Sequence, residues 1–286
     1  DNRFDNQLDF THNQLTGRDD ILKLSGSTND FVHKRSHIMS YEAPLEDSFR
    51  HRLEVHWSSS EFFSTVTNFQ NPDGSNKDVL GKQFAIGGKL ENNLYQSRDF
   101  FVDLVTDITF RNVKSNNKLG EFGWAEAYFL MPEVSLTFTR TTALSSLFQS
   151  FTFQRGFPEI ANTDQRQVNA LGRGPGPDQT TPISIRPSII KWNSFVSFFL
   201  EPLLFPESWN DPSTPESSTL AHEMNFTTNG QYTHEYRLPP QFKFSNGGMY
   251  SVRGYPDDMD SGDIGFHVNL EYKFHLPRVF SIQPIP

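Results

Sequence analysis

Strict alternation of apolar and polar side chains between residues 264 and 275 constrains the fold of this chain more than any other feature of the sequence. The apolar positions are Phe266, Val268, Leu270, Tyr272 and Phe274, and the polar positions between them are His267, Asn269, Glu271, Lys273 and His275. This period predicts a β-strand with one apolar and one polar face. A soluble sandwich would bury the apolar face, whereas an outer-membrane barrel would turn it towards lipid and the polar face towards a wet lumen. The periodicity is compatible with both.

Further segments along the chain alternate in the same way and predict about a dozen strands. Residues 121–130 and 133–142 are expected to form two strands joined at Met131-Pro132. Tight turns, as at residues 96–98, alternate with longer polar loops, as at residues 71–77 and 206–218, which is typical of outer-membrane barrels. Residues 157–185 lack a strand pattern, so we expect a long surface loop there.

The composition narrows the class of protein. The 28 Phe, 8 Tyr and 4 Trp residues suit strands and the aromatic girdles of membrane barrels. No apolar run reaches the roughly 18 residues that a transmembrane helix needs, so helical membrane spans are excluded. Because the chain has no cysteine, disulfides, thiolate catalysis and cysteine-based metal sites are excluded too. The formal charge of −9, without a basic run, argues against a nucleic-acid partner.

The segment that leads into the last strand has an unusual combination of residues. It opens with Leu238-Pro239-Pro240, continues through Gly247-Gly248 and Ser251-Val252-Arg253-Gly254-Tyr255, and ends with Ser261-Gly262-Asp263. The glycines and prolines predict a long loop that is folded as a hairpin between two strands. The segment resembles the signature loop of the TpsB transporters of two-partner secretion, the ShlB/FhaC/HecB haemolysin secretion and activation family. Val-Arg-Gly-Tyr alone also occurs in the wider superfamily that includes BamA-type insertases, but the flanking residues favour secretion.

The resemblance implies an all-β fold, a transmembrane antiparallel β-barrel of sixteen strands that follows two POTRA domains. The close match covers residues 238–278, and a looser match covers the first strands. Only about twelve strands and no POTRA domain are visible in the sequence. We therefore expect residues 1–286 to form a partial outer-membrane barrel domain, an open sheet without the N-terminal POTRA domains and the C-terminal strands. A continuous ladder between the first and last strands would instead indicate a smaller closed barrel.

The function implied by the resemblance is that of an outer-membrane translocator which secretes and activates a haemolysin-like or adhesin-like exoprotein. The expected partners are that exoprotein and outer-membrane lipid, with no nucleic acid, cofactor or enzymatic step. The alternatives are a BamA-like outer-membrane assembly factor, a passive porin and, from the soluble class, a β-sandwich binding module.

The site residues implied by the resemblance lie in the signature loop, residues 239–263, which folds into the lumen. Arg253 is expected at its tip, paired with an aspartate of a strand beyond Pro286 or with a nearby acid such as Asp257, Asp263 or Glu271. Alternatively, Gly254 merely permits a tight turn and Arg253 is solvated. The other expected loop residues are Gly247, Gly248, Val252, Gly254, Tyr255, Gly262 and Asp263.

No catalytic or metal-binding residue is assigned from the sequence. His222-Glu223 begins like a zincin helix motif, but it lacks the second histidine four residues after the first and lies in an alternating segment. The glycines of residues 172–177 have the wrong spacing for a dinucleotide-binding loop. Neither a nucleophile elbow nor a catalytic carboxylate pair stands out in the sequence. An outer-membrane barrel enzyme such as a lipase or a protease is a further alternative, although no residue pattern points to it.

Overall fold

The structure is a computed structural model that describes residues 6–28, 35–46, 50–70, 76–116, 124–171, 184–204, 206, 220–234, 237–246 and 260–276. The polar loops expected at residues 71–77 and 206–218, and the glycine-rich residues 172–177, lie wholly or mainly outside these ranges.

Eleven antiparallel strands form the main sheet, and each strand pairs with the next strand of the sheet along the chain. The strands are β1 (Asn6–Asn13), β2 (Ile21–Thr28), β3 (Arg35–Pro44), β4 (His51–Gln70), β5 (Asn76–Ser97), β6 (Phe100–Asn116), β7 (Trp124–Thr141), β8 (Ser145–Arg155), β9 (Ser188–Phe199), β10 (His222–Tyr232) and β13 (Gly265–Phe274). Two short strands, β11 (Phe244–Asn246) and β12 (Asp260–Gly262), pair with each other between β10 and β13. The fold is all-β, as predicted.

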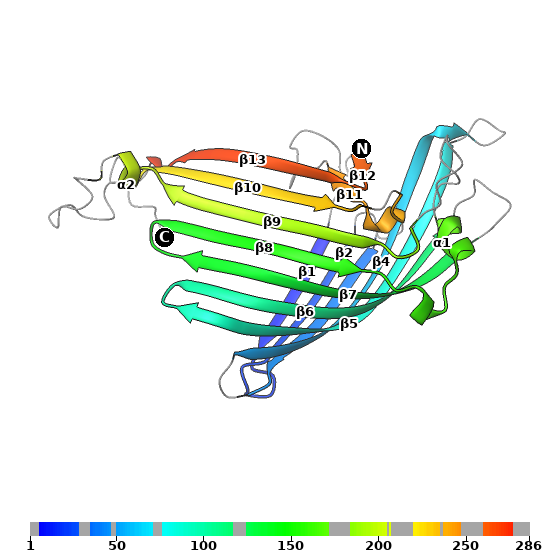
Figure 1. The fold of residues 1–286 in the computed structure, drawn as a ribbon, viewed down its shortest axis with the longest axis horizontal. Helices are drawn as coiled ribbons and strands as arrows, with labels where there is room; N and C mark the ends of the chain where they lie inside the picture. The colour runs from blue at the N-terminus through cyan, green and yellow to red at the C-terminus, as the bar shows by residue number, and fades with distance from the viewer. Residues whose placement is uncertain are drawn as a thin grey trace.

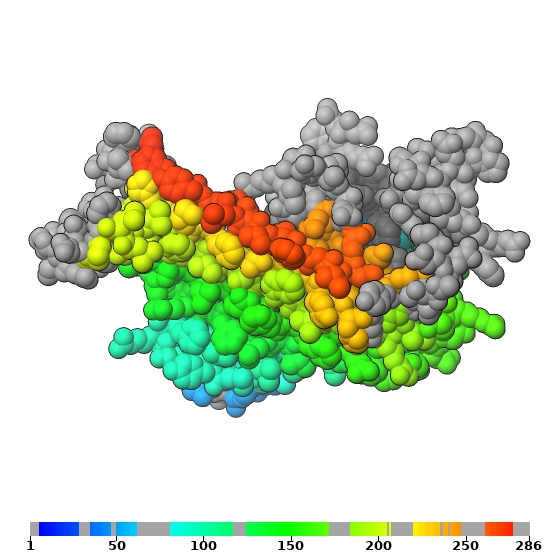
Figure 2. Space-filling view, turned by 45° about the horizontal axis from the view of Figure 1, so that its top comes forward, coloured from blue at the N-terminus to red at the C-terminus, as the bar shows by residue number. Residues whose placement is uncertain are grey.

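The sheet curves strongly, so that β1 to β4 lie behind β5 to β13 in Figure 1. Figure 2 shows the later strands packed side by side, from β13 through β10 and β9 to the earlier ones. Within the described residues, β1 pairs only with β2 and β13 only with β10, so no ladder joins the first and last strands. The sheet is therefore an open part of a barrel wall, as expected, and the closed smaller barrel is not observed.

The convex face of the sheet is apolar and exposed. One row of directly opposed residues crosses the first seven strands on this face: Phe10, Leu24, Met39, Trp57, Ile86, Phe110 and Leu130. On β13 the predicted apolar positions lie on the same face, and Leu270 is 64% exposed. An exposed apolar face this wide suits hydrocarbon rather than water.

The concave face is mainly polar, and much of it is buried. Thr109, Ser135, Gln154 and Asn225 point to this side and are each less than 9% exposed. Side chains converge on the inside of a curved sheet, so polar groups there become buried against one another. Their hydrogen bonds compensate for the loss of water, as between the Ser135 and Thr152 hydroxyls at 2.7 Å.

The connections differ at the two ends of the strands (Figure 1). At one end, β5 joins β6 and β7 joins β8 through tight turns, and the short helix α2 (Glu201–Leu204) follows β9. At the other end lie the long connections, with η1 (Glu159–Ala161), α1 (Gln165–Leu171), η2 (Pro240–Phe242), β11 and β12. Short turns and long loops therefore alternate as predicted, except that the connection from β9 to β10, residues 200–221, is long and lies at the tight-turn end. No helix within the described ranges is long and apolar enough to cross a membrane.

The strand break predicted at Met131-Pro132 is wrong, because β7 runs without interruption through Pro132. The amide of Leu130 donates to Phe157 on the β8 side of β7 at 3.4 Å, so the missing N–H of Pro132 faces the same side. The β7–β8 ladder runs only from Glu133 to Thr141. Proline therefore costs β7 no ladder bond at this position.

The surface loop predicted for residues 157–185 is also wrong over its first half. Residues 157–171 fold back onto β7 and form η1 and α1, and Val168 and Leu171 of α1 are buried. The hydroxyl of Thr163 accepts a hydrogen bond from the Tyr128 amide of β7 at 2.8 Å. Thr163, Val168 and Leu171 thus pack this segment onto the long-loop end of the sheet, whereas Glu159 and Ile160 are exposed.

Candidate functional site on the concave face

The signature loop begins and ends in a structured base. Residues 237–246 leave β10 through η2 and β11, and residues 260–264 return through β12 to β13. Phe244, Ser245 and Asn246 pair with Gly262, Ser261 and Asp260. The predicted hairpin is therefore present at the base of the loop, and we call residues 237–246 with 260–265 the loop base.

The carboxylate of Asp263 ties the two ends of the loop base together. Its Oδ2 accepts from the Arg237 amide and its Oδ1 from the Leu238 amide, both at 2.9 Å. Gln231 of β10 donates from Nε2 to the Phe242 carbonyl at 2.7 Å and to the Asp263 carbonyl at 3.2 Å. Arg237 has a φ of 65°, which is costly for a residue with a Cβ, and the bond to the carboxylate helps to stabilise it.

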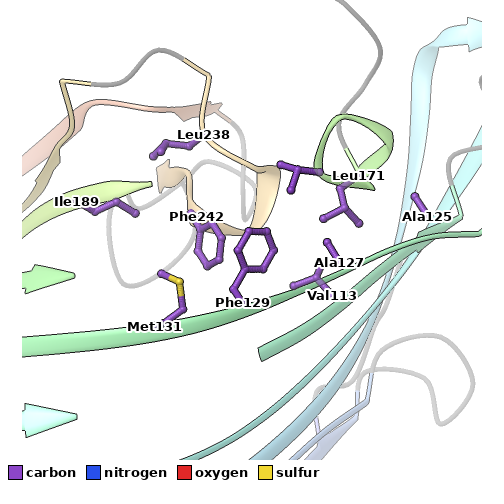
Figure 3. Packing of buried hydrophobic residues seen from close by; sticks show 10 residues of the cluster. Val113, Ala125, Ala127, Phe129, Met131, Leu171, Ile189, Leu238 and Phe242 are labelled. Carbon is purple, nitrogen blue, oxygen red and sulfur yellow. The ribbon is translucent and has the colours of Figure 1, made fainter. Parts of the chain in front are cut away.

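Apolar side chains hold the loop base against the concave face of the sheet. Phe242 meets Phe129 of β7 edge to face, with ring centroids 5.3 Å apart. Leu238, Met131 and Ile189 surround this pair, and all five are at most 5% exposed (Figure 3). Phe129 and Met131 occupy the concave positions of β7, opposite in direction to the exposed Val134. The start of the loop therefore folds inward, onto the face that is polar elsewhere.

Helix α1 extends the same apolar cluster sideways. Val168 and Leu171 pack with Val113 of β6 and with Ala125 and Ala127 of β7 (Figure 3). The concave face at the long-loop end is thus covered by two segments from different parts of the chain.

A glycine lets the loop base approach β13 closely. The ring of Phe244 lies over Gly265, and a Cβ added there would be 2.5 Å from Phe244 Cδ1. The same ring lies beside His267 of β13, with centroids 6.0 Å apart. A side chain at position 265 would therefore displace Phe244.

Charged side chains line the concave face next to the apolar cluster. Arg111 of β6 lies with its Cζ 6.0 Å from the centre of the Phe242 ring, within cation–π distance. Its Nε–H is buried and donates to none of the described residues, while Glu133 and Asp107 interact with the guanidinium electrostatically. Lys191 of β9 donates to Gln154 Oε1 at 3.1 Å.

The polar wall continues towards the tight-turn end as a set of cross-strand ion pairs. Lys89 Nζ contacts Glu54 Oε2 at 2.5 Å, and Arg52 pairs with Glu42 and with Asp19. A wall with alternating charges binds water well and offers no continuous apolar surface. A polar polypeptide can therefore move along such a wall through a lumen without binding to it tightly.

Of the predicted site residues, the structure describes Gly262 and Asp263. Gly262 ends β12, and Asp263 closes the loop base as described above. Gly247, Gly248, Val252, Arg253, Gly254 and Tyr255 lie outside the described residues.

The partners of the loop on the sheet were missed by the sequence-based prediction. The signal was present in β7, where the concave positions are apolar up to Met131 and polar from Glu133 onwards. A polar-lined barrel has no need of an apolar concave segment unless another part of the chain covers it.

His222 lies in β10, the strand that the alternation predicted, and not in the helix that a zincin motif needs. Its Nδ1 is 2.5 Å from the Tyr272 hydroxyl of β13. The described ranges contain no group of three His, Cys, Asp or Glu side chains that could hold a metal ion.

An open barrel wall with an exposed apolar convex face, a polar concave face and an inwardly folded loop defines a membrane-spanning β-barrel protein. The model of the family described as haemolysin secretion/activation protein ShlB/FhaC/HecB matches residues 2–285. The chain therefore belongs to this family, and the sheet is part of the barrel of an outer-membrane protein. The resemblance drawn from the loop sequence is confirmed.

Solved structures share the fold at low sequence identity. The chain is similar to CdiB from Escherichia coli (TM-score 0.68, 17% identity, 94% of this chain and 44% of that chain). CdiB from Acinetobacter baumannii gives a TM-score of 0.65 at 17% identity, over 96% of this chain and 44% of that chain. BamA from Haemophilus ducreyi lacking POTRA domains 1-3 gives 0.53 at 12% identity, over 89% and 43%. The chain thus spans less than half of each of these chains. No significant match was found among curated proteins.

Proposed function

We propose that this chain is the translocating barrel of a two-partner secretion transporter, which passes an unfolded exoprotein of the haemolysin or adhesin type across the outer membrane. The observation that carries the proposal is the loop base, folded onto the concave face of the barrel wall in a chain of the ShlB/FhaC/HecB family. A loop whose base lies on the concave face at the long-loop end would control what passes through the lumen.

The proposed mechanism has no chemical step and uses two parts of the loop differently. The loop base is fixed by the Asp263 carboxylate and by the packing of Phe242 on Phe129. The part between residues 246 and 260 carries Arg253 and changes position when the exoprotein arrives. The charged concave wall keeps the passing chain hydrated, so that it folds only outside the cell.

A BamA-like assembly factor is the second candidate, because the barrel wall also resembles BamA. Secretion is favoured by the family match over residues 2–285 and by the higher TM-scores with CdiB, 0.65 and 0.68 against 0.53. A barrel that inserts membrane proteins would be needed for the outer-membrane assembly of other barrels. Depletion of this protein should instead leave other barrels assembled and remove a secreted protein from the medium.

In this mechanism Arg253 forms a bidentate ion pair with a lumenal carboxylate. Lysine keeps the charge but lacks the planar fork, so Arg253→Lys should reduce secretion nearly as much as Arg253→Ala, by about tenfold or more. Secreted exoprotein is measured in the culture medium, and barrel assembly is measured by heat-modifiable migration of the transporter. Arg140→Lys, at an exposed ion pair with Asp99, is the matched control and should secrete normally. Normal secretion by Arg253→Ala would remove this residue from the mechanism.

A further inference from the structure

The connection between β9 and β10 is the long exception at the tight-turn end of the sheet. It spans residues 200–221, whereas the other connections at this end are residues 14–20, 45–50, 98–99 and 142–144. It begins with α2, which lies at the tips of β9 and β10 (Figure 1). In outer-membrane barrels the end with the short turns faces the periplasm. A connection of this length is unusual in a compact fold and is often functional.

Three leucines share one side of the helical turn that opens this connection. The amides of Leu203 and Leu204 both donate to the Leu200 carbonyl, at 3.0 and 2.9 Å, so residues 200–204 form one turn of helix. Residues three and four positions apart lie on the same side of a helix, which places Leu203 and Leu204 beside Leu200. Leu203 is 68% exposed and Leu204 is 61% exposed. The turn therefore presents an apolar surface.

The position of Leu200 shows which way this surface faces. Val196 of β9 lies opposite Phe226 of β10, which in turn lies opposite Leu270 on the convex face. Leu200 is four residues after Val196, so the alternation places it on the convex face too. Its amide donates to the His222 carbonyl at 2.9 Å, which extends the β9–β10 ladder to this residue. The apolar side of the turn thus continues the convex face past the end of the strands.

Glu201 holds the turn against the start of β10. Its side chain is 7% exposed, and its Oε1 accepts from the amides of Ala221 and His222 at 2.6 and 2.8 Å. Glu201 is the one charged residue of α2, so no charged side chain of this helix is exposed. Because the turn is already ordered, presenting its leucines to a partner costs little conformational entropy.

An aromatic cluster marks the membrane interface at this end of the convex face. The ring of His222 stacks on the ring of Tyr272, with centroids 5.8 Å apart, and lies 5.0 Å from the ring of Phe274. Amphipathic rings are enriched where the hydrocarbon layer meets the headgroups, and they form the girdles of membrane barrels. The ladder bond between Leu200 and His222 places the turn next to this cluster.

We propose that α2 is an interfacial anchor, in which Leu203 and Leu204 insert into the phospholipid leaflet at the tight-turn end of the barrel. Lipid is the favoured occupant because the leucines continue the apolar convex face and lie next to the aromatic cluster. No exposed charge on α2 opposes the insertion. The anchor would hold the β9–β10 end of the sheet at a fixed depth in the membrane, and the proposal does not depend on what the barrel transports.

The test measures the depth of α2 in the membrane with nitroxide spin labels. Because the chain has no cysteine, Leu203→Cys and Leu204→Cys each provide a single labelling site. The labelled protein is reconstituted in phospholipid vesicles, and the collision rate of the label with oxygen is divided by its collision rate with a water-soluble nickel chelate. Leu270→Cys is the control in hydrocarbon, and Ser97→Cys, exposed beside the turn between β5 and β6, is the control in water. Heat-modifiable migration checks that each variant is assembled.

We expect the oxygen-to-nickel ratio at positions 203 and 204 to exceed the ratio at position 97 by about threefold or more, because an interfacial helix lies about 5–10 Å deep in the boundary between headgroups and acyl chains. Adding Glu201→Ala to Leu204→Cys removes the tether and should lower the ratio towards that of position 97. An unchanged ratio in this double variant would contradict the role of Glu201.

Two results would overturn the anchor itself. Ratios at positions 203 and 204 equal to the ratio at position 97 would place the leucines in water. Low collision rates with both oxygen and the nickel chelate, while positions 270 and 97 behave as expected, would show that protein covers the leucines. The surface would then belong to a protein partner and not to lipid.

Discussion

Replacing Phe242 with alanine should release the loop base from the concave face and destabilise it by about 3–5 kcal/mol. The Phe242 ring is 5% exposed and fills the space between Phe129, Met131 and Leu238. Its removal leaves a cavity that the curved sheet cannot close, because Phe129 and Met131 are fixed by the β6–β7 ladder. The guanidinium of Arg111, which lies over the same ring, also loses its cation–π contact. Both the cavity and the lost cation–π contact destabilise the packed loop base.

Limited proteolysis of the loop in the membrane-assembled protein measures this release, together with the urea dependence of unfolding. Phe226→Ala is the matched control, because Phe226 is a phenylalanine of β10 on the convex face and 36% exposed. The loop of Phe242→Ala should be cleaved at concentrations of protease at which the control and the wild type stay intact. Equal protection of the two variants would show that the ring does not anchor the loop.

Leu270→Arg should destabilise the assembled barrel by about 2–4 kcal/mol, whereas Asn269→Arg should be tolerated. The two residues are neighbours in β13 but point to opposite faces. Leu270 is 64% exposed on the convex face. The charge of an arginine there would either lie in the hydrocarbon layer or require the side chain to reach out of it, and both cost free energy. Asn269 lies on the concave face, where its amide donates to Glu271 Oε1 at 3.2 Å, and an arginine there meets water and carboxylates.

The comparison is made by equilibrium unfolding in lipid vesicles, with heat-modifiable migration as the measure of assembly. Because the two substitutions introduce the same side chain one residue apart, differences in expression or net charge cancel. Similar stabilities for the two variants would contradict the assignment of the convex face to lipid.

Alternation was sufficient to predict the faces of the strands, since a period of two fixes which residues share a side. It predicted the convex face of β13 and the strand character of His222 correctly. It failed at Pro132, because a proline is compatible with a strand when its missing N–H faces a position without a ladder partner. The position at which β8 stops pairing with β7 depends on both strands, so the sequence of β7 alone does not reveal it.

The residues of the signature loop were sufficient to locate the loop in the sequence. They did not predict the surface of the sheet on which the loop base packs. Asp263 was found from the resemblance, yet its hydrogen bonds to the amides of Arg237 and Leu238 depend on the fold of a segment about 25 residues away. Helix α1 was missed because its seven residues provide only Val168 and Leu171 as buried positions, too few for a helical period. Short elements of this kind are stabilised by the surface they cover.

Photocross-linking from position 242 tests most directly whether the loop base lies inside the barrel against β7. A benzophenone analogue of phenylalanine in place of Phe242 keeps the aromatic ring, which lies 5.3 Å from the ring of Phe129. Irradiation of intact cells followed by mass spectrometry of the peptides should give cross-links to residues 127–131. The same probe at Leu270 should react with lipid and not with β7. Cross-links from position 242 to lipid, or to no part of β7 while position 270 reacts with lipid as expected, would contradict the account.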